Sequence, residues 1–130
     1  MRPTWATIAA LSICLLLLAG CGPFGGKSEQ DKAGVALTEL VEARNQGDYA
    51  RVCELIAAPD LAKFKQAGVS CEKTIRQRFG EAASTTIRIE DVKVKDDHAS
   101  VDATVSQTGG AGFARTFRLV KEDGDWKFLF

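Results

Sequence analysis

Residues 87–105 read IRIEDVKVKDDHASVDATV, in which apolar and polar residues alternate as they do along a half-buried β-strand. Ile87 and Ile89 share one phase of this alternation, whereas Val92 and Val94 share the opposite phase. A change of phase by one residue would move the apolar side chains to the other face of a sheet. An extra residue near Glu90 and Asp91 restores a common face, and we therefore predict a β-bulge at this point.

The strand pattern continues to the end of the chain. A polar turn is expected at residues 95–98, a loose glycine-rich hairpin connection at 109–112 and a tight turn at 123–124. Ala99, Val101, Ala103 and Val105 would share one face of the second strand. The third strand is marked by Phe113, Phe117 and Leu119 and the fourth by Trp126, Phe128 and Phe130, of which Trp126 and Phe128 are expected in the core. This part of the chain is therefore predicted to form four strands joined by hairpins.

Before Gly80 the apolar residues recur at intervals of three and four, which is typical of helices. Asp31, Asp48 and Ser70 are suited to cap three helices, and Pro59 can open a short helical turn between the last two. The inner faces would carry Ala33, Ala36, Leu37, Leu40 and Val41, then Tyr49, Val52, Cys53, Ile56 and Ala57, then Leu61 and Phe64, and finally Cys71, Ile75 and Phe79. The predicted fold class is α+β, with N-terminal helices packed on a four-stranded antiparallel sheet.

The chain begins with a short basic segment and an apolar run that starts near residue 8 and ends in LAGC at 18–21. This is the layout of a signal peptide, and the run is shorter than the roughly 20 apolar residues of a membrane-spanning helix. The LAGC sequence resembles the lipobox of bacterial lipoproteins. The resemblance implies that residues 1–20 are removed and that Cys21 carries diacylglycerol and, on its amino group, a further chain such as palmitate. An ordinary cleaved signal and an uncleaved anchor are the alternatives.

Lipidation of Cys21 would anchor the protein to the cell membrane on its extracytoplasmic face. Each buried methylene group adds roughly 0.8 kcal/mol of membrane affinity, so two or three acyl chains hold far better than one. Residues 21–30 are rich in glycine and polar residues and are expected to form a flexible tether. Residues 31–130 are long enough for one domain with a single core, and not for two.

The full chain carries 17 basic and 17 acidic residues, and only Arg2 of these lies in the predicted signal. The part that follows the signal therefore has 16 basic and 17 acidic residues, a net charge of −1. Binding of nucleic acid requires a basic face, and this balance argues against it. The expected partners are the membrane, through Cys21, and an envelope protein or a small apolar ligand.

Four cysteines are present, of which Cys14 lies in the predicted signal and Cys21 is the predicted lipidation site. Cys53 and Cys71 remain, and in an oxidising exported compartment we interpret them as a disulfide that closes a loop of about 19 residues. Two free thiols, a redox pair and half of a metal site are the alternatives. With His98 as the sole histidine and no CxxC spacing, soft ligands are too few for zinc, and we predict no metal and no cofactor.

Two short motifs, GDYA at 47–50 and DWKF at 125–128, accompany the order of helices followed by strands. With them, residues 31–130 resemble the nuclear transport factor two-like superfamily, and most closely its small lipoprotein members, many of them from actinobacteria. The resemblance implies a cone, in which a curved four-stranded antiparallel sheet wraps around the helices. Some of these lipoproteins carry cysteines in the second helix and before the third, where Cys53 and Cys71 would lie. A cystatin-like helix on a meander is the alternative fold.

Few residues suit catalysis, which usually needs an acid or base in a pocket. Asp91 lies at the predicted bulge, Asp102 on the polar face of its strand and His98 in a turn, and exposure to solvent is the simpler interpretation of all three. No Ser-His-Asp arrangement can be built, and the glycines at 109–112 lack the helix that follows a phosphate-binding loop. We therefore expect that the protein is not an enzyme.

Two residues are predicted to contact a ligand. Arg115 shares its strand phase with Phe113 and Phe117 and would face the concave side of the sheet. An unpaired buried arginine is costly, so its guanidinium should reach the rim or meet an anion. Tyr49, on the inner stripe of the second helix, could lend its hydroxyl to the same cavity, although a core tyrosine is the simpler interpretation.

Three functions remain open. A non-catalytic interaction module of the cell envelope, the first choice, would expose an apolar patch on its sheet. A carrier of a small apolar ligand, the alternative, would enclose a deep apolar cavity with one or two polar groups. An isomerase-like or hydrolase-like enzyme, the third, would bury Asp91 or Asp102 beside a partner. Pairing of two domains into a homodimer through their sheets is left open.

Overall fold

The computed structural model describes residues 27–130, in which four helices precede four strands. The helices are α1 (Glu29–Gln46), α2 (Tyr49–Glu54), α3 (Ala58–Gln66) and α4 (Cys71–Phe79). The strands are β1 (Thr85–Lys95), β2 (His98–Gln107), β3 (Phe113–Glu122) and β4 (Asp125–Leu129). The predicted signal peptide, the predicted lipidation site Cys21 and the first part of the predicted tether lie outside the described residues. The order of elements confirms the predicted α+β class.

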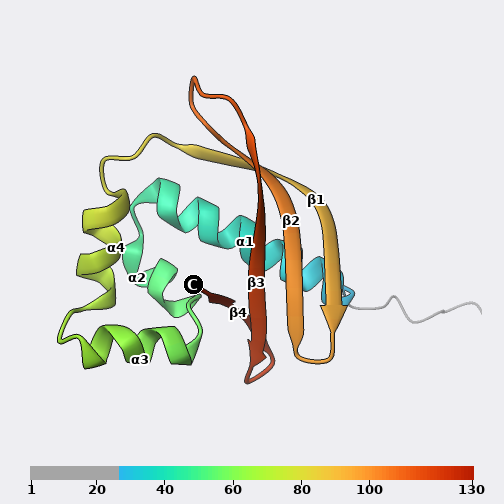
Figure 1. Cartoon of the computed structure of the whole chain (residues 1–130), viewed down its shortest axis with the longest axis horizontal. Helices are drawn as coiled ribbons and strands as arrows, with labels where there is room; N and C mark the ends of the chain where they lie inside the picture. Colours follow the sequence, from blue (N-terminus) through green and yellow to red (C-terminus); the bar gives the residue numbers. More distant parts are fainter. Residues whose placement is uncertain (1–26) are drawn as a thin grey trace, which may run out of the picture.

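The strands form one antiparallel sheet in the order β1-β2-β3-β4. Ile89 pairs with Ala103, whereas Asp91 pairs with Asp102, so Glu90 is an extra residue and the predicted β-bulge is confirmed. The bulge keeps the isoleucines and valines of β1 on one face of the sheet. Figure 1 shows the sheet curving over α1, with α2, α3 and α4 gathered near the C-terminal end of that helix.

Two apolar clusters fill the interior. The larger lies between α1 and the concave face of the sheet and includes Leu37, Val101 and Leu119, which are fully buried. The smaller joins the end of α1 to α2 and α4 and includes Val52 and Ile75. The alternation along β2 and the spacing of three and four along the helices therefore place apolar side chains inside, as predicted.

The N-cap of α1 differs from the prediction. Ser28 is the cap: its side-chain oxygen accepts a hydrogen bond from the backbone N–H of Asp31 (3.1 Å), whose carboxylate accepts one from the backbone N–H of Ser28 (3.1 Å). This reciprocal capping box satisfies two N–H groups at once, so the predicted cap at Asp31 is wrong. The helix begins at Glu29, two residues before the predicted start of the domain. Asp48 and Ser70 cap α2 and α4 as predicted.

A disulfide joins Cys53 of α2 to Cys71 of α4, with 6.1 Å between the Cα atoms. The predicted pairing is therefore confirmed over free thiols, a redox pair and half of a metal site. Both cysteines pack against the cluster of Val52 and Ile75, so the cross-link fixes α4 beside α2 at the edge of the core.

Glu29, in the first turn of α1, links this helix to the last hairpin. Its carboxylate accepts hydrogen bonds from the Nζ atoms of Lys32 (2.8 Å) and Lys121 (2.9 Å) and from the indole N–H of Trp126 (3.1 Å). The hydrogen bond from Lys32, followed by that from Lys121, lowers the pKa of Glu29 from 4.5 to about 2. The ionised carboxylate therefore ties the start of α1 to β3 and β4.

The low pKa of Glu29 predicts a pH-dependent contribution to stability. A carboxyl group whose pKa is lowered on folding stabilises the protein above its unfolded pKa, and this stabilisation is lost as the pH falls through the folded pKa. Glu29→Gln should therefore be less stable than the unmodified chain at pH 6, and the difference should shrink between pH 4.5 and about 2. Urea unfolding across this range measures it. Glu42→Gln, on the exposed side of the same helix, is the control; a Glu29→Gln difference that is independent of pH would contradict the prediction.

Candidate functional site

An apolar cavity of about 340 Å³ lies between the concave face of the sheet and the helices. We call it the cone cavity. Its helical wall consists of Leu40 and Val41 from α1, Val52 from α2, and Ile75 and Phe79 from α4. Its opposite wall consists of Ile87 from β1, Val105 from β2, Phe113 and Phe117 from β3, and Phe130, which follows β4.

Strand register and the disulfide position these walls. Ile87 pairs with Val105, which in turn pairs with Phe113, so the three side chains form one row across the sheet. The residues of α4 that face the row follow Cys71 by one and two helical turns, and the disulfide holds the first turn of this helix against α2. The cavity therefore depends on the sheet and on a cross-linked helix.

Three arginines line the cone cavity: Arg44 from α1, Arg78 from α4 and Arg115 from β3. The guanidinium of Arg44 donates a hydrogen bond to the hydroxyl of Thr85 and lies 5.4 Å from the centre of the Phe79 ring. That of Arg115 lies 5.2 Å from the centre of the Phe117 ring. A cation against an aromatic face gains quadrupole attraction. Arg44 also donates to the side-chain oxygen of Asn45 (3.4 Å) and to the backbone carbonyl of Ala83 (3.4 Å).

The charged side chains that line the cone cavity have one sign. No aspartate or glutamate lines it, and within residues 27–130 no carboxylate lies within ion-pair distance of any of the three arginines. Arg78 and Arg115 are exposed, whereas Arg44 is half-buried. Arg115 therefore reaches the rim, one of the two positions expected for its guanidinium.

Tyr49 does not line the cone cavity. It borders a separate, polar pocket of about 200 Å³ together with Phe79 and Gly80, and its ring centre lies 5.5 Å from the guanidinium of Arg76. The structure therefore does not bring Tyr49 and Arg115 to one site.

The candidate acids and the histidine lie away from the cone cavity. Asp91 is exposed and pairs with Lys93 (3.2 Å), while Asp102 accepts a hydrogen bond from Thr116 on the same outer face. His98 is exposed, and its Nδ1 lies 2.8 Å from a carboxylate oxygen of Asp97. All three are placed as the solvent-facing interpretation expects. Within residues 27–130 no group of three or more metal-ligating side chains is found, and no helix is long and apolar enough to cross a bilayer.

Sequence reasoning missed Arg44 and Arg78. Arg44 follows Val41 by three residues, and Arg78 follows Ile75 by three, so each lies on the inner side of its helix. This spacing is the signal that could have identified them, although an arginine at a helix edge usually extends to solvent.

The convex face of the sheet is polar. Arg88 pairs with Glu90 along β1 (2.8 Å), and Glu90 accepts a hydrogen bond from the hydroxyl of Thr104 on β2 (2.9 Å). Lys93 adds contacts with Asp91 and with Asp102 (3.9 Å) on the neighbouring strand. The apolar sheet patch expected of an interaction module is therefore not found on this face.

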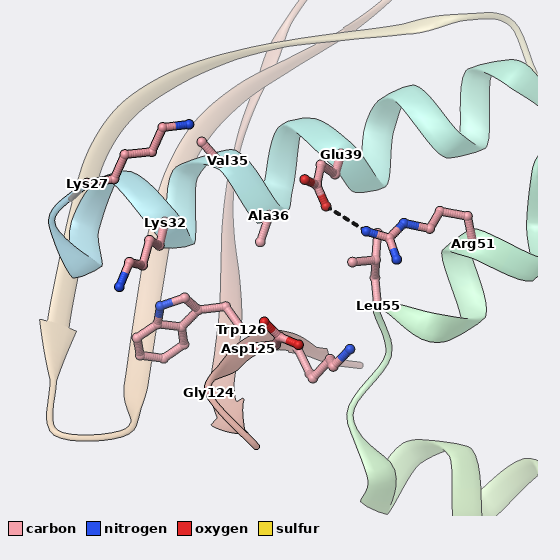
Figure 2. Close-up of a pocket in the computed structure, with 11 residues that line it drawn as sticks. Lys27, Lys32, Val35, Ala36, Glu39, Arg51, Leu55, Gly124, Asp125 and Trp126 are labelled. Carbon is pink, nitrogen blue, oxygen red and sulfur yellow. Dashed lines mark hydrogen bonds and ion pairs between the residues drawn. The ribbon is translucent and has the colours of Figure 1, made fainter.

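A second concave region, of about 260 Å³, lies between α1, α2 and β4. Figure 2 shows the carboxylate of Glu39 pointing at the guanidinium of Arg51, with 3.1 Å between Oε2 of Glu39 and Nη2 of Arg51. Arg51 also pairs with Glu54 (2.9 Å), and Lys127 donates to the backbone carbonyl of Glu54 (2.7 Å). Because these cations are already satisfied from within the chain, the cone cavity is the better candidate for an external ligand.

Comparison with known proteins identifies the fold. No family model matches the chain, and no curated protein matches its sequence. Among solved structures, a candidate dehydratase of the NTF2-like family from Streptomyces avermitilis is 18% identical with a TM-score of 0.53, over 76% of this chain and 89% of that one. A candidate NTF2-like transpeptidase from Campylobacter jejuni is 16% identical with a TM-score of 0.52, over 75% and 97%.

An NTF2-like protein of unknown function from Shewanella baltica is 14% identical with a TM-score of 0.53, over 75% of this chain and 86% of its own. Identities this low carry no information on activity, because one fold hosts many functions. The TM-scores above 0.5 over three quarters of the chain nevertheless agree across these NTF2-like structures, and this chain has the NTF2-like fold.

Proposed function

We propose that the protein is a non-catalytic binding module of the cell envelope, lipid-anchored at Cys21, which holds a small apolar molecule in the cone cavity. The apolar cavity of about 340 Å³ carries this proposal. Ligand pockets are typically about 300–1,000 Å³ and mainly apolar, with a few polar groups that orient the ligand. The cone cavity has this composition, with its arginines as the orienting groups.

The polar outer face of the sheet supports a ligand-binding function over docking of another protein. A module that docks another protein through its sheet would need an apolar outer face, and the outer face carries ion pairs and hydroxyls such as those of Arg88, Glu90 and Thr104. Among residues 27–130 the large exposed aromatic side chains are Phe113 and Phe130, and both border the cavity. A ligand in the cavity would cover them.

Anchoring through Cys21 is tested by substitution. Cys21→Ala should abolish incorporation of labelled palmitate and either release the protein to the soluble fraction or leave an uncleaved precursor. Cys14→Ala removes the neighbouring thiol within the predicted signal and should leave both lipidation and membrane association unchanged. Lipid labelling and processing that persist in Cys21→Ala would contradict the proposed anchor.

Native mass spectrometry of the full protein, extracted gently from the cells that make it, tests for a ligand. We expect an additional mass, of a few hundred daltons at most for a cavity of this size, which is lost on activation in the gas phase. A protein that is consistently free of bound small molecules, and that also binds none of a panel of apolar compounds, would contradict the proposed function.

Filling the cone cavity should abolish ligand binding. Ile87→Trp adds a large ring to the row of Ile87, Val105 and Phe113 inside the cavity, and should lower the affinity for an apolar probe at least tenfold. Arg88→Trp, one residue later and on the outer face, is the matched control and should bind normally. Circular dichroism verifies that both variants are folded, and equal binding by the two would place the ligand outside the cavity.

A further inference from the structure

We propose that the ligand is an amphiphile with one anionic head group, whose chain lies in the cone cavity and whose head group binds the arginines at its mouth. This inference rests on the proposed function and names the class of molecule. The observation behind it is the charge of the lining: Arg44, Arg78 and Arg115 all border the cavity, and no acidic residue does.

The three arginines come from three different elements, α1, α4 and β3, so no local sequence pattern brings them together. They line an apolar chamber whose floor includes the buried side chains of Val52 and Ile75. A neutral apolar molecule would suit this cavity if its rim were neutral. Because the side chains at the rim are cationic, a ligand that also carries an anionic group suits the cavity better.

Two of the arginines, Arg44 and Arg115, are also held in a way that suits an anion. Arg44 is oriented by the hydroxyl of Thr85 and by the ring of Phe79, and Arg115 lies over the ring of Phe117. A guanidinium fixed against an aromatic ring loses less conformational freedom when it binds a carboxylate or phosphate in a bidentate manner. The apolar walls lower the local dielectric, which strengthens such a contact relative to one in water.

Burial gives the orientation of the ligand. Arg78 and Arg115 are exposed, whereas Val52 and Ile75 are only 4% exposed. The head group therefore lies at the solvent side and the chain points towards the helices. Arg51, in the second concave region, differs from the arginines of the cone cavity because it already pairs with two carboxylates.

The test uses the full chain in zwitterionic nanodiscs and four small probes: octanoate, octyl phosphate, octanol and acetate. The first three share one chain and differ in head group, and acetate supplies the head group without the chain. Nuclear magnetic resonance reads the two halves of the site separately, because methyl signals of Val105 and Ile75 report the chain and guanidinium signals of Arg78 and Arg115 report the head group.

We expect at least one of the two anionic amphiphiles to bind about tenfold or more tightly than octanol and to shift the guanidinium signals, a preference equivalent to about 1.4 kcal/mol. The tighter of the two identifies the head group as a carboxylate or a phosphate. Octanol should shift the methyl signals alone, and acetate should bind far more weakly than octanoate.

Each other outcome has a distinct meaning. If octanol binds as tightly as both anions, the inferred head group is wrong and the proposed function stands. If acetate binds as tightly as octanoate, the site binds a free anion and the inferred amphiphile is wrong. If no probe shifts the methyl signals, the proposed function fails together with the inference.

Two variants test whether Arg115 binds the head group. Arg115→Gln should weaken binding of the preferred anionic amphiphile severalfold and leave octanol binding unchanged, because the apolar walls are untouched. Arg88→Gln removes an arginine from the outer face, where it pairs with Glu90, and should change neither. Equal losses for the anion and octanol in Arg115→Gln would show that Arg115 acts by packing, and would overturn its assignment to the head group.

Discussion

Phe128→Ala is expected to lower the free energy of unfolding by about 3–5 kcal/mol, as large-to-small substitutions of buried aromatic residues do. Phe128 is 2% exposed, and its ring meets that of Phe117 edge to face, with 6.4 Å between the centroids. Its backbone also joins β4 to the helical half: the N–H donates to the carbonyl of Leu55 (2.8 Å), and the carbonyl accepts from the N–H of Ala57 (2.8 Å). Loss of the ring leaves a cavity where the sheet and the α2–α3 junction meet.

Urea unfolding, followed by far-ultraviolet circular dichroism, measures this effect. Phe130→Ala is the matched control, because Phe130 is two residues away and 55% exposed, and it should cost less than about 1 kcal/mol. Similar losses in the two variants would mean that Phe128 is not the packed centre of this junction.

The second large effect is expected from the disulfide. The double variant Cys53→Ala with Cys71→Ala should lose about 3 kcal/mol of stability, because the cross-link restricts a loop of this length in the unfolded chain. The loss should fall on α4, whose contacts with the rest of the domain are mainly those with α2. Since Ile75 and Arg78 lie on α4, the variant should also bind cavity ligands more weakly.

Thermal unfolding with and without a reducing agent tests this expectation. The unmodified chain should lose stability on reduction and then match the double variant, whereas the double variant should not respond to the reductant. A reductant-sensitive double variant, or an unmodified chain whose thiols react with a blocking agent before reduction, would contradict the structural role of the disulfide.

Much of the fold could be predicted because it is encoded locally. The opposite phases of the isoleucines and valines near Glu90 require one extra residue, and the structure places the bulge there. The prediction of the α1 N-cap was wrong for a local reason as well. Ser28 and Asp31 are both good capping residues three positions apart, and only the reciprocal hydrogen bonds between them decide which one begins the helix.

The candidate site was harder to predict. Arg115 could be found from its phase along β3, whereas Arg44 and Arg78 lie on helix edges, where the sequence cannot distinguish a cavity from solvent. Tyr49 lies on the inner stripe of α2, yet its ring makes a cation–π contact with Arg76 and does not line the cone cavity. A cavity is a space left between elements that are distant along the chain, and a periodic pattern records only which face of each element turns inward.

The contact between Phe128 and the α2–α3 junction also bears on how the protein is made. Ile56 and Phe128 form a parallel bridge across 72 positions of sequence, so the α2–α3 junction gains its partner strand only when the end of the chain is present. Long-range closure of this kind is slow, because the loop must form before its contacts stabilise it. A chain that ends before β4 lacks the Phe128 ring that packs at this junction, so we expect the domain to complete its folding only after the last strand is present.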